Sequence, residues 1–126
     1  MRVLVTGGRN FYDQNTVFQA LDALEEKHGE LVVIQGGASG ADLIARNWCF
    51  RHKSRVRMIN EPADWKAHGK AAGPIRNQVM IDDHQPNLVL AFPGGRGTED
   101  MVRRAVAAGI PVKRVAPSLS AGENGR

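Results

Sequence analysis

Residues 88–100 read Leu-Val-Leu-Ala-Phe-Pro-Gly-Gly-Arg-Gly-Thr-Glu-Asp, and this stretch decides the fold. An apolar run typical of a buried strand, Leu88 to Phe92, ends in a glycine turn, and a helical pattern follows the turn. Glycine adopts backbone angles closed to other residues, so main-chain N–H groups can come close to a ligand there. The first N–H groups of a helix lack internal partners and lie at the positive end of its dipole. The stretch therefore predicts a turn that suits a phosphate group.

Two earlier apolar runs end in the same way. Residues 3–5 lead into Thr6-Gly7-Gly8-Arg9, and residues 31–34 lead into Gln35-Gly36-Gly37-Ala38-Ser39-Gly40. A single glycine pair after a strand is often only a tight turn. Three such turns instead favour a common rim, that is, one edge of the sheet at which all three turns lie. In an open parallel sheet, ligands bind outside the carboxyl ends of the strands, where the strand order reverses. We therefore expect the three turns to lie together around a ligand.

The rest of the chain alternates between helical and extended patterns. Helical spacing of apolar residues recurs over residues 17–24, 41–49, 75–83 and 101–106, and further strands are expected over residues 56–59 and 112–115. This alternation predicts a single Rossmann-like α/β domain over residues 1–116, with a parallel sheet of about five strands and helices on both faces. Residues 117–126 lack periodicity, and we expect them to form a flexible C-terminal tail.

Polar residues at the expected helix starts have two interpretations. Ser39 and Asp42 have the spacing of a capping box, and Thr98 is placed to cap the last helix. Glu99 and Asp100 suit the first turn of a helix as ordinary acids that complement its dipole. Each of these residues could instead face a ligand, and the pattern alone leaves both roles open.

The composition limits the chemical class of the partner but does not identify the partner. The formal net charge of +4 favours an anionic partner, such as a nucleotide or a nucleic acid. The first residues enter a strand directly and no apolar run approaches ~20 residues, so we expect a cytoplasmic protein that does not enter a membrane. The one cysteine, Cys49, lies in a helical pattern and is expected to be a packed side chain. The histidines show no metal-ligand spacing, so we expect no metal site.

Three motifs together resemble the SLOG superfamily, and most closely its YspA-related group, a domain-of-unknown-function family. They are Gly36 to Asp42, Gly73 to Gln78 and Phe92 to Thr98, and the resemblance runs from Met1 to about Val115. It implies a Rossmann-like fold that binds a nucleotide or a nucleotide-derived ligand, such as an ADP-ribose or NAD derivative. It also implies a homodimer. No cofactor is implied beyond such a bound ligand.

The last motif is similar to the PGG-x-GT-x-x-E signature of LOG phosphoribohydrolases, which cleave the N-glycosidic bond of nucleoside 5′-monophosphates. Gly94, Gly95, Gly97 and Thr98 match the phosphate-binding part of that signature. Arg76 resembles the arginine of the LOG site, since it lies on the helix before the signature strand. The glutamate of the signature is replaced by Met101. This departure argues against LOG-type hydrolysis.

The nearest carboxylates to the missing glutamate are Glu99 and Asp100, but each residue along a helix turns a side chain by ~100°. They are the candidate catalytic residues if the protein is a nucleotide N-glycosidase, because a carboxylate stabilises the positive charge that develops on ribose. Trp65 is placed either to stack on a base or to latch its loop over the sheet. The basic residues Lys66 to Lys70 follow it and suit an anionic ligand.

The favoured function is a sensor or binding module for a nucleotide-like small molecule. The alternative is LOG-type N-glycosidase activity. A second alternative, nucleic-acid binding like that of the DprA branch of the superfamily, rests on the basic run Arg51 to Arg57 and is less favoured. The residues expected to contact the ligand or its phosphate are Gly7, Gly8, Arg9, Gly36, Gly37, Ser39, Asp42, Trp65, Arg76, Asn77, Pro93, Gly94, Gly95, Gly97 and Thr98.

Overall fold

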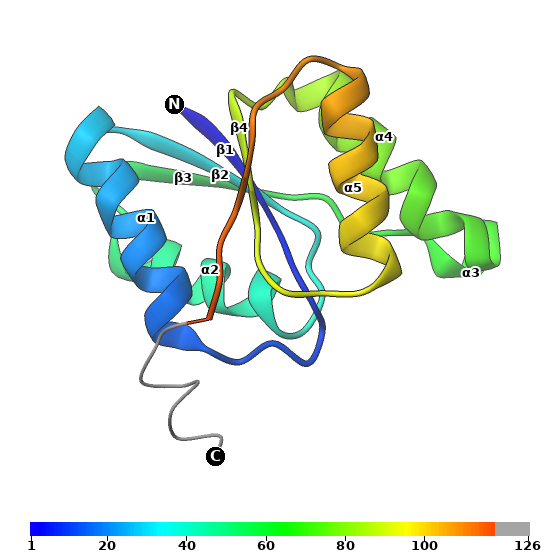
Figure 1. Ribbon diagram of the computed structural model, residues 1–126, viewed down its shortest axis with the longest axis horizontal. Coiled ribbons are helices and arrows are strands. Elements are labelled where there is room, and N and C mark those ends of the chain that lie inside the picture. The colour runs from blue at the N-terminus through cyan, green and yellow to red at the C-terminus, as the bar shows by residue number, and fades with distance from the viewer. Residues whose placement is uncertain (118–126) are drawn as a thin grey trace.

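The computed structural model describes residues 1–117 of the 126-residue chain (Figure 1). The flexible tail expected from residue 117 therefore lies outside the described residues, apart from its first residue. The elements follow one another as β1 (Arg2–Thr6), α1 (Gln14–His28), β2 (Leu31–Gln35), α2 (Ala41–Arg51), β3 (Val56–Asn60), α3 (Trp65–His68), the 3-10 turn η1 (Gly69–Ala71), α4 (Ala72–His84), β4 (Leu88–Ala91), α5 (Arg96–Ala107) and β5 (Val112–Arg114).

The strands form one five-stranded sheet in the order β3-β2-β1-β4-β5, and every neighbouring pair is parallel. The chain moves outward from β1 to β3 and then returns to place β4 on the other side of β1. The strand order therefore reverses between β1 and β4, where a crevice opens at the carboxyl ends of the strands. The α/β Rossmann-like arrangement expected from the sequence is confirmed.

Each face of the sheet has its own apolar core, because successive side chains of a strand point to opposite faces. On one face Val3 and Val5 pack with Leu21 of α1 and Trp48 of α2. On the other, Leu4 packs with residues of α4 and α5, among them Met80 and Met101. Figure 1 shows α1 and α2 on one side of the sheet and α4 and α5 on the other.

The capping predictions are wrong. Helix α2 begins after Gly40 and α5 after Gly95, and neither end has a side-chain cap. Ser39 instead donates its hydroxyl to the carbonyl oxygen of Arg9, 3.1 Å away on another loop. Thr98 is buried inside the first turn of α5. Ser39 therefore bonds to another loop and Asp42 to the loop before α2, so neither caps a helix.

The segment between β3 and β4 also differs from the expected single helix. A short helix, α3, begins at Trp65 and is capped by Asp64, whose carboxylate accepts the backbone N–H of Ala67 at 3.0 Å. Helix α4 then begins at Ala72, earlier than the apolar pattern indicated. Within residues 1–117, no helix has the length and apolar character needed to span a bilayer.

Candidate ligand-binding site

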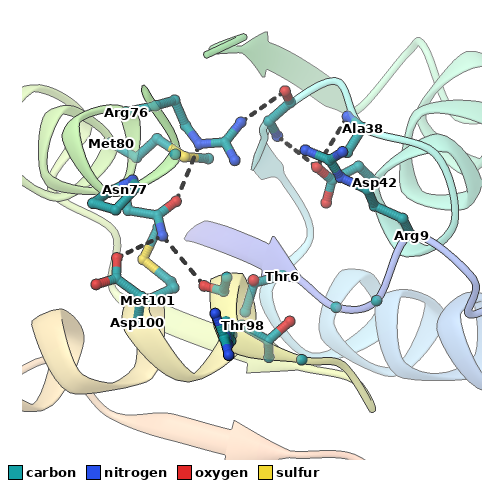
Figure 2. A pocket seen from close by; sticks show the side chains of 18 of the residues that line it. Thr6, Arg9, Ala38, Asp42, Arg76, Asn77, Met80, Thr98, Asp100 and Met101 are labelled. Atoms are coloured by element: carbon teal, nitrogen blue, oxygen red, sulfur yellow. Dashed lines mark hydrogen bonds between the residues drawn. The ribbon is translucent and has the colours of Figure 1, made fainter. Parts of the chain in front are cut away.

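A cavity of about 570 Å³ lies at the carboxyl ends of β1 and β2 and at the amino end of α5. Its walls come from the loops after β1, β2 and β4 and from α4, so the glycine turns do converge on one rim (Figure 2). The sequence-predicted residues that line it are Gly7, Gly8, Arg9, Gly36, Asp42, Trp65, Arg76, Asn77, Gly95, Gly97, Thr98 and Asp100.

Five predicted residues are not among those that line the cavity, namely Gly37, Ser39, Pro93, Gly94 and Glu99. Gly94 is packed into its own turn, where an added Cβ would collide with Thr98 and with the backbone of Gly8. Glu99 is exposed and makes two 2.8 Å hydrogen bonds with the Arg114 guanidinium, which hold the pKa of Glu99 below its ordinary value. The Glu99 carboxylate therefore pairs with Arg114 of β5 and does not line the cavity.

The loop after β2 is clamped by two buried or half-buried charges. Asp42 accepts the backbone N–H groups of Gly36 and Ala38, both at 3.2 Å. Arg76 donates through Nη1 to the carbonyl oxygens of Gly36 at 2.9 Å and Glu61 at 3.3 Å. Figure 2 shows Arg76 and Asp42 reaching this loop from opposite sides. The loop therefore already holds an anion of its own, the Asp42 carboxylate, where a ligand phosphate was expected.

Burial dominates the protonation of this pair. It raises the pKa of Asp42 to about 6, although the two backbone hydrogen bonds and the positive charges of Arg76 and Arg9 oppose the rise. Burial likewise lowers the pKa of Arg76, and the Asp42 charge partly restores it. Asp42 at neutral pH is therefore an ionised group held in the cavity wall at an energetic cost, and it offsets part of the positive charge there.

Asp100 is the second carboxylate in the cavity wall, and other side chains already engage it. Its Oδ2 accepts hydrogen bonds from Asn77 at 2.9 Å and Arg104 at 2.8 Å, and its Oδ1 accepts one from Arg103 at 3.3 Å. Burial raises the pKa of Asp100, but the hydrogen bonds from Arg104 and Asn77 outweigh it and leave the pKa below its ordinary value. Asp100 is thus an ionised, fully partnered group.

The floor of the cavity is apolar. Leu4, Met80 and Met101 contribute to it, and Met101 is 1% exposed. The side chain that replaces the LOG glutamate is thus packed in the core below α5. Sequence reasoning did not predict this floor, because an apolar residue of a buried strand or helix face looks the same in the sequence whether it lines a pocket or packs in the core.

The open end of α5 is the best-prepared anion site in the wall. Within residues 1–117 no side chain caps this helix, and its first N–H groups have no intrahelical acceptor. An added Cβ at Gly95 or Gly97 would meet nothing within 4 Å, so both positions leave the backbone open. Arg96 and Arg103, which sequence reasoning missed, also line the cavity. Arg96 was recognisable as the variable position inside the glycine motif.

Trp65 lies at the rim of the cavity from the side of α3. It is 49% exposed, and the guanidinium of Arg9 lies 5.2 Å from the centre of its ring. The loop after β1 and the start of α3, which are distant in sequence, thus meet at the cavity in a cation–π contact. The half-exposed ring leaves an aromatic surface open to solvent.

The basic run Arg51 to Arg57 lies away from this cavity. It spans the end of α2 and the start of β3, at the amino ends of the parallel strands, and none of its residues lines the cavity. Arg51 and Lys53 lie over the rings of Phe18 and Phe50, at 5.3 and 5.9 Å from the ring centres. The basic run therefore adds no positively charged residue to the cavity lining.

The fold and the cavity together define an α/β protein of Rossmann-like arrangement with a candidate ligand site at the switch point of its sheet. Residues 1–68 match the family model described as "YspA, cpYpsA-related SLOG family". The gene 61 protein of Mycobacterium phage D29 is 44% identical over 117 residues, which cover 88% of this chain and 93% of that protein. The chain belongs to the YspA, cpYpsA-related SLOG family. The matched residues include the first two glycine turns, and the third lies beyond them.

Proposed function

We propose that this protein binds a nucleotide or nucleotide-derived ligand in the cavity at the switch point and acts as a sensor or binding module. The observation that carries the proposal is the uncapped amino end of α5, which opens into the cavity beside Arg96 and Arg103. The first N–H groups of α5, the helix dipole and the adjacent Arg96 favour a phosphate at the start of this helix.

The remaining wall suits the other parts of such a ligand. Trp65 offers a half-exposed ring on which a base could stack, which is worth ~1–3 kcal/mol for nucleic-acid bases on aromatic side chains. Arg76 lines the cavity and keeps its Nη2 group free of hydrogen bonds to the described residues. The apolar floor completes a site with few convergent polar groups, as is usual for small-molecule pockets.

Binding is favoured over N-glycosidic hydrolysis by the state of the carboxylates. Hydrolysis needs a carboxylate free to stabilise the ribose cation or to take a proton from water. Of the two acids in the cavity wall, Asp42 is bonded to its own loop and Asp100 to Asn77, Arg103 and Arg104. Glu99 lies outside the cavity lining.

The proposal is tested by calorimetric titration of the purified chain with a nucleoside 5′-monophosphate, ADP-ribose and NAD. Saturable binding of at least one of them is expected. Arg96→Gln should weaken that binding, whereas Arg57→Gln should not, because Arg57 is an exposed arginine of β3 outside the cavity. Both variants change the net charge equally, so equal effects would indicate only non-specific attraction. Failure of all three ligands to bind would overturn the proposal.

Chromatography of the same mixtures for free base distinguishes binding from hydrolysis. If the protein is a sensor or binding module, the ligand should be bound and should remain intact. Release of free base, abolished in Asp100→Asn while binding is retained, would establish the N-glycosidase instead.

A further inference from the structure

A second group of titratable side chains lies outside the cavity, between α1 and the end of α2. The carboxylates of Asp22 and Glu25 project from α1, and His52 follows the last residue of α2. The Nε2 atom of His52 is 3.8 Å from Asp22 Oδ1 and 3.9 Å from Glu25 Oε1. One potential ligand atom from each residue lies within 4.8 Å of the others.

Trp48 orients two members of this group. The ring of His52 stacks on Trp48 with 4.1 Å between ring centres, and its Nδ1 lies 2.7 Å from the Trp48 carbonyl oxygen. A carbonyl can only accept, so Nδ1 carries a proton and donates it, and Nε2 faces the two carboxylates. The indole N–H of Trp48 donates to Asp22 Oδ1 at 2.8 Å. Because Trp48 is fully buried, both orientations are tied to the core.

The spacing suits an ion better than a direct contact. A charge-assisted hydrogen bond from an imidazolium to a carboxylate would place the atoms ~2.8 Å apart, about 1 Å closer than they are. Ligand atoms at 2.0–2.2 Å from a tetrahedral metal ion are about 3.4 Å from one another. The two His52 distances exceed this by about half an ångström, and all three ligand atoms lie within 4.8 Å of one another, so a modest inward movement of the side chains would complete such a site.

Among the described residues, His52 is the only ion-pair partner within 4.0 Å of Asp22 or Glu25. The cations next to His52 in sequence are directed elsewhere, Arg51 over the ring of Phe18 and Lys53 over that of Phe50. A histidine whose other ring nitrogen donates to a backbone carbonyl has the orientation typical of metal-bound histidines. All three side chains are partly exposed, so an ion has access to them.

We propose that Asp22, Glu25 and His52 bind a divalent first-row transition ion, with Zn²⁺ as the representative, in a site whose fourth position is left to water. One imidazole and two carboxylates suit such an ion, whereas Mg²⁺ and Ca²⁺ prefer oxygen ligands alone. The ion joins α1 to the end of α2, away from the nucleotide cavity. The proposal does not depend on the function of that cavity.

The test is calorimetric titration of the chelator-stripped protein with Zn²⁺, together with its thermal unfolding. We expect saturation at one ion per chain and a rise in Tm, because an ion bound only to the folded state stabilises it. Mg²⁺ at the same concentrations should give neither. Glu25→Gln should weaken Zn²⁺ binding by at least about tenfold. Glu26→Gln, the adjacent exposed acid on α1, should leave it unchanged.

Two further variants keep the result interpretable. Asp22→Asn retains an oxygen that can accept from Trp48, so it removes a ligand charge with little change to packing. His28→Ala removes an exposed histidine of α1 outside the group. Loss of binding in Asp22→Asn and Glu25→Gln but not in His28→Ala supports the site. Absence of saturable Zn²⁺ binding, or binding that the Asp22 and Glu25 variants leave intact, overturns it.

Discussion

Arg76 holds the carbonyl oxygen of Gly36 through Nη1 at 2.9 Å, a contact that joins α4 to the loop after β2 across 40 residues of sequence. The same loop is held from its other side by Asp42. An arginine that the sequence marks as a phosphate ligand is therefore first a support for the cavity wall. Its Nη2 group makes no hydrogen bond to the described residues, so Arg76 can also bind a ligand phosphate. Support of the wall and phosphate binding require different experiments.

The glycines of the rim should separate into structural and ligand-facing positions. An added Cβ at Gly36 would collide with Arg76 Nη1, so Gly36→Ala should destabilise the fold by ~1–3 kcal/mol. Gly97→Ala meets open space on a helix and should raise stability by about 0.5 kcal/mol while it weakens nucleotide binding. Thermal unfolding and calorimetry check both. Unchanged affinity in Gly97→Ala would show that the ligand does not approach the start of α5.

Asp42 should make folding stability depend on pH in an unusual direction. Because its folded pKa of about 6 exceeds its ordinary value of 3.8, the folded protein binds this proton more tightly than the unfolded chain. The contribution of Asp42 to stability therefore increases as pH falls through 6 and levels off near 3.8. Comparing denaturant unfolding of the parent and Asp42→Asn between pH 8 and pH 5 isolates it. The stability of the parent relative to Asp42→Asn should increase on acidification.

The same protonation should strengthen binding of an anionic ligand. Like charges ~4 Å apart repel by about 4 kcal/mol at an effective dielectric near 20, and the repulsion falls with distance, so neutralising Asp42 should improve affinity by less than that amount. ADP-ribose is the suitable probe, because its diphosphate diester does not titrate between pH 8 and pH 5. Calorimetry across this range should show tighter binding at low pH in the parent and a flatter profile in Asp42→Asn. Parallel profiles would place the ligand charge away from Asp42.

Substitution of Arg76 should reveal both of its roles. Arg76→Ala should weaken nucleotide binding by ~1.5–3 kcal/mol, the scale of a hydrogen bond to a charged group. It should also lower Tm, because Asp42 would remain buried without its cation. Arg76→Lys should restore only part of each loss, since the planar fork is gone. A variant that loses Tm but binds like the parent would restrict Arg76 to support of the wall.

Trp65 should contribute to affinity and little to stability. Trp65→Ala removes a 49% exposed ring and should cost ~1–3 kcal/mol in binding of a base-containing ligand, with Tm nearly unchanged. A ligand without a base, such as ribose 5-phosphate, should bind parent and variant equally. Ligand-induced quenching of tryptophan fluorescence should also disappear, because the remaining Trp48 is buried away from the cavity. A large loss of Tm would instead identify Trp65 as a latch.

The sequence by itself determined the architecture and the position of the rim. Alternating apolar strands and helical patterns, interrupted by glycine turns after residues 5, 34 and 92, are sufficient for a parallel sheet, since parallel strands need crossover helices. Parallel strands also place their carboxyl ends at one edge, so the turns had to converge there. The replacement of the LOG glutamate by Met101 was equally visible in the chain.

Only the tertiary structure decided which groups are free to act. Asp42 was indistinguishable from a helix cap until the fold placed it under the N–H groups of Gly36 and Ala38. Glu99 was a catalytic candidate until Arg114 of β5 paired with it. The approach of His52 to α1 was equally hidden, because it joins residues of two helices. The outcomes for Glu99 and His52 depend on partners distant in the chain, and the outcome for Asp42 depends on its burial and on the path of the loop before α2. Local patterns encode neither, whereas strands, turns and helices follow from neighbours in the chain.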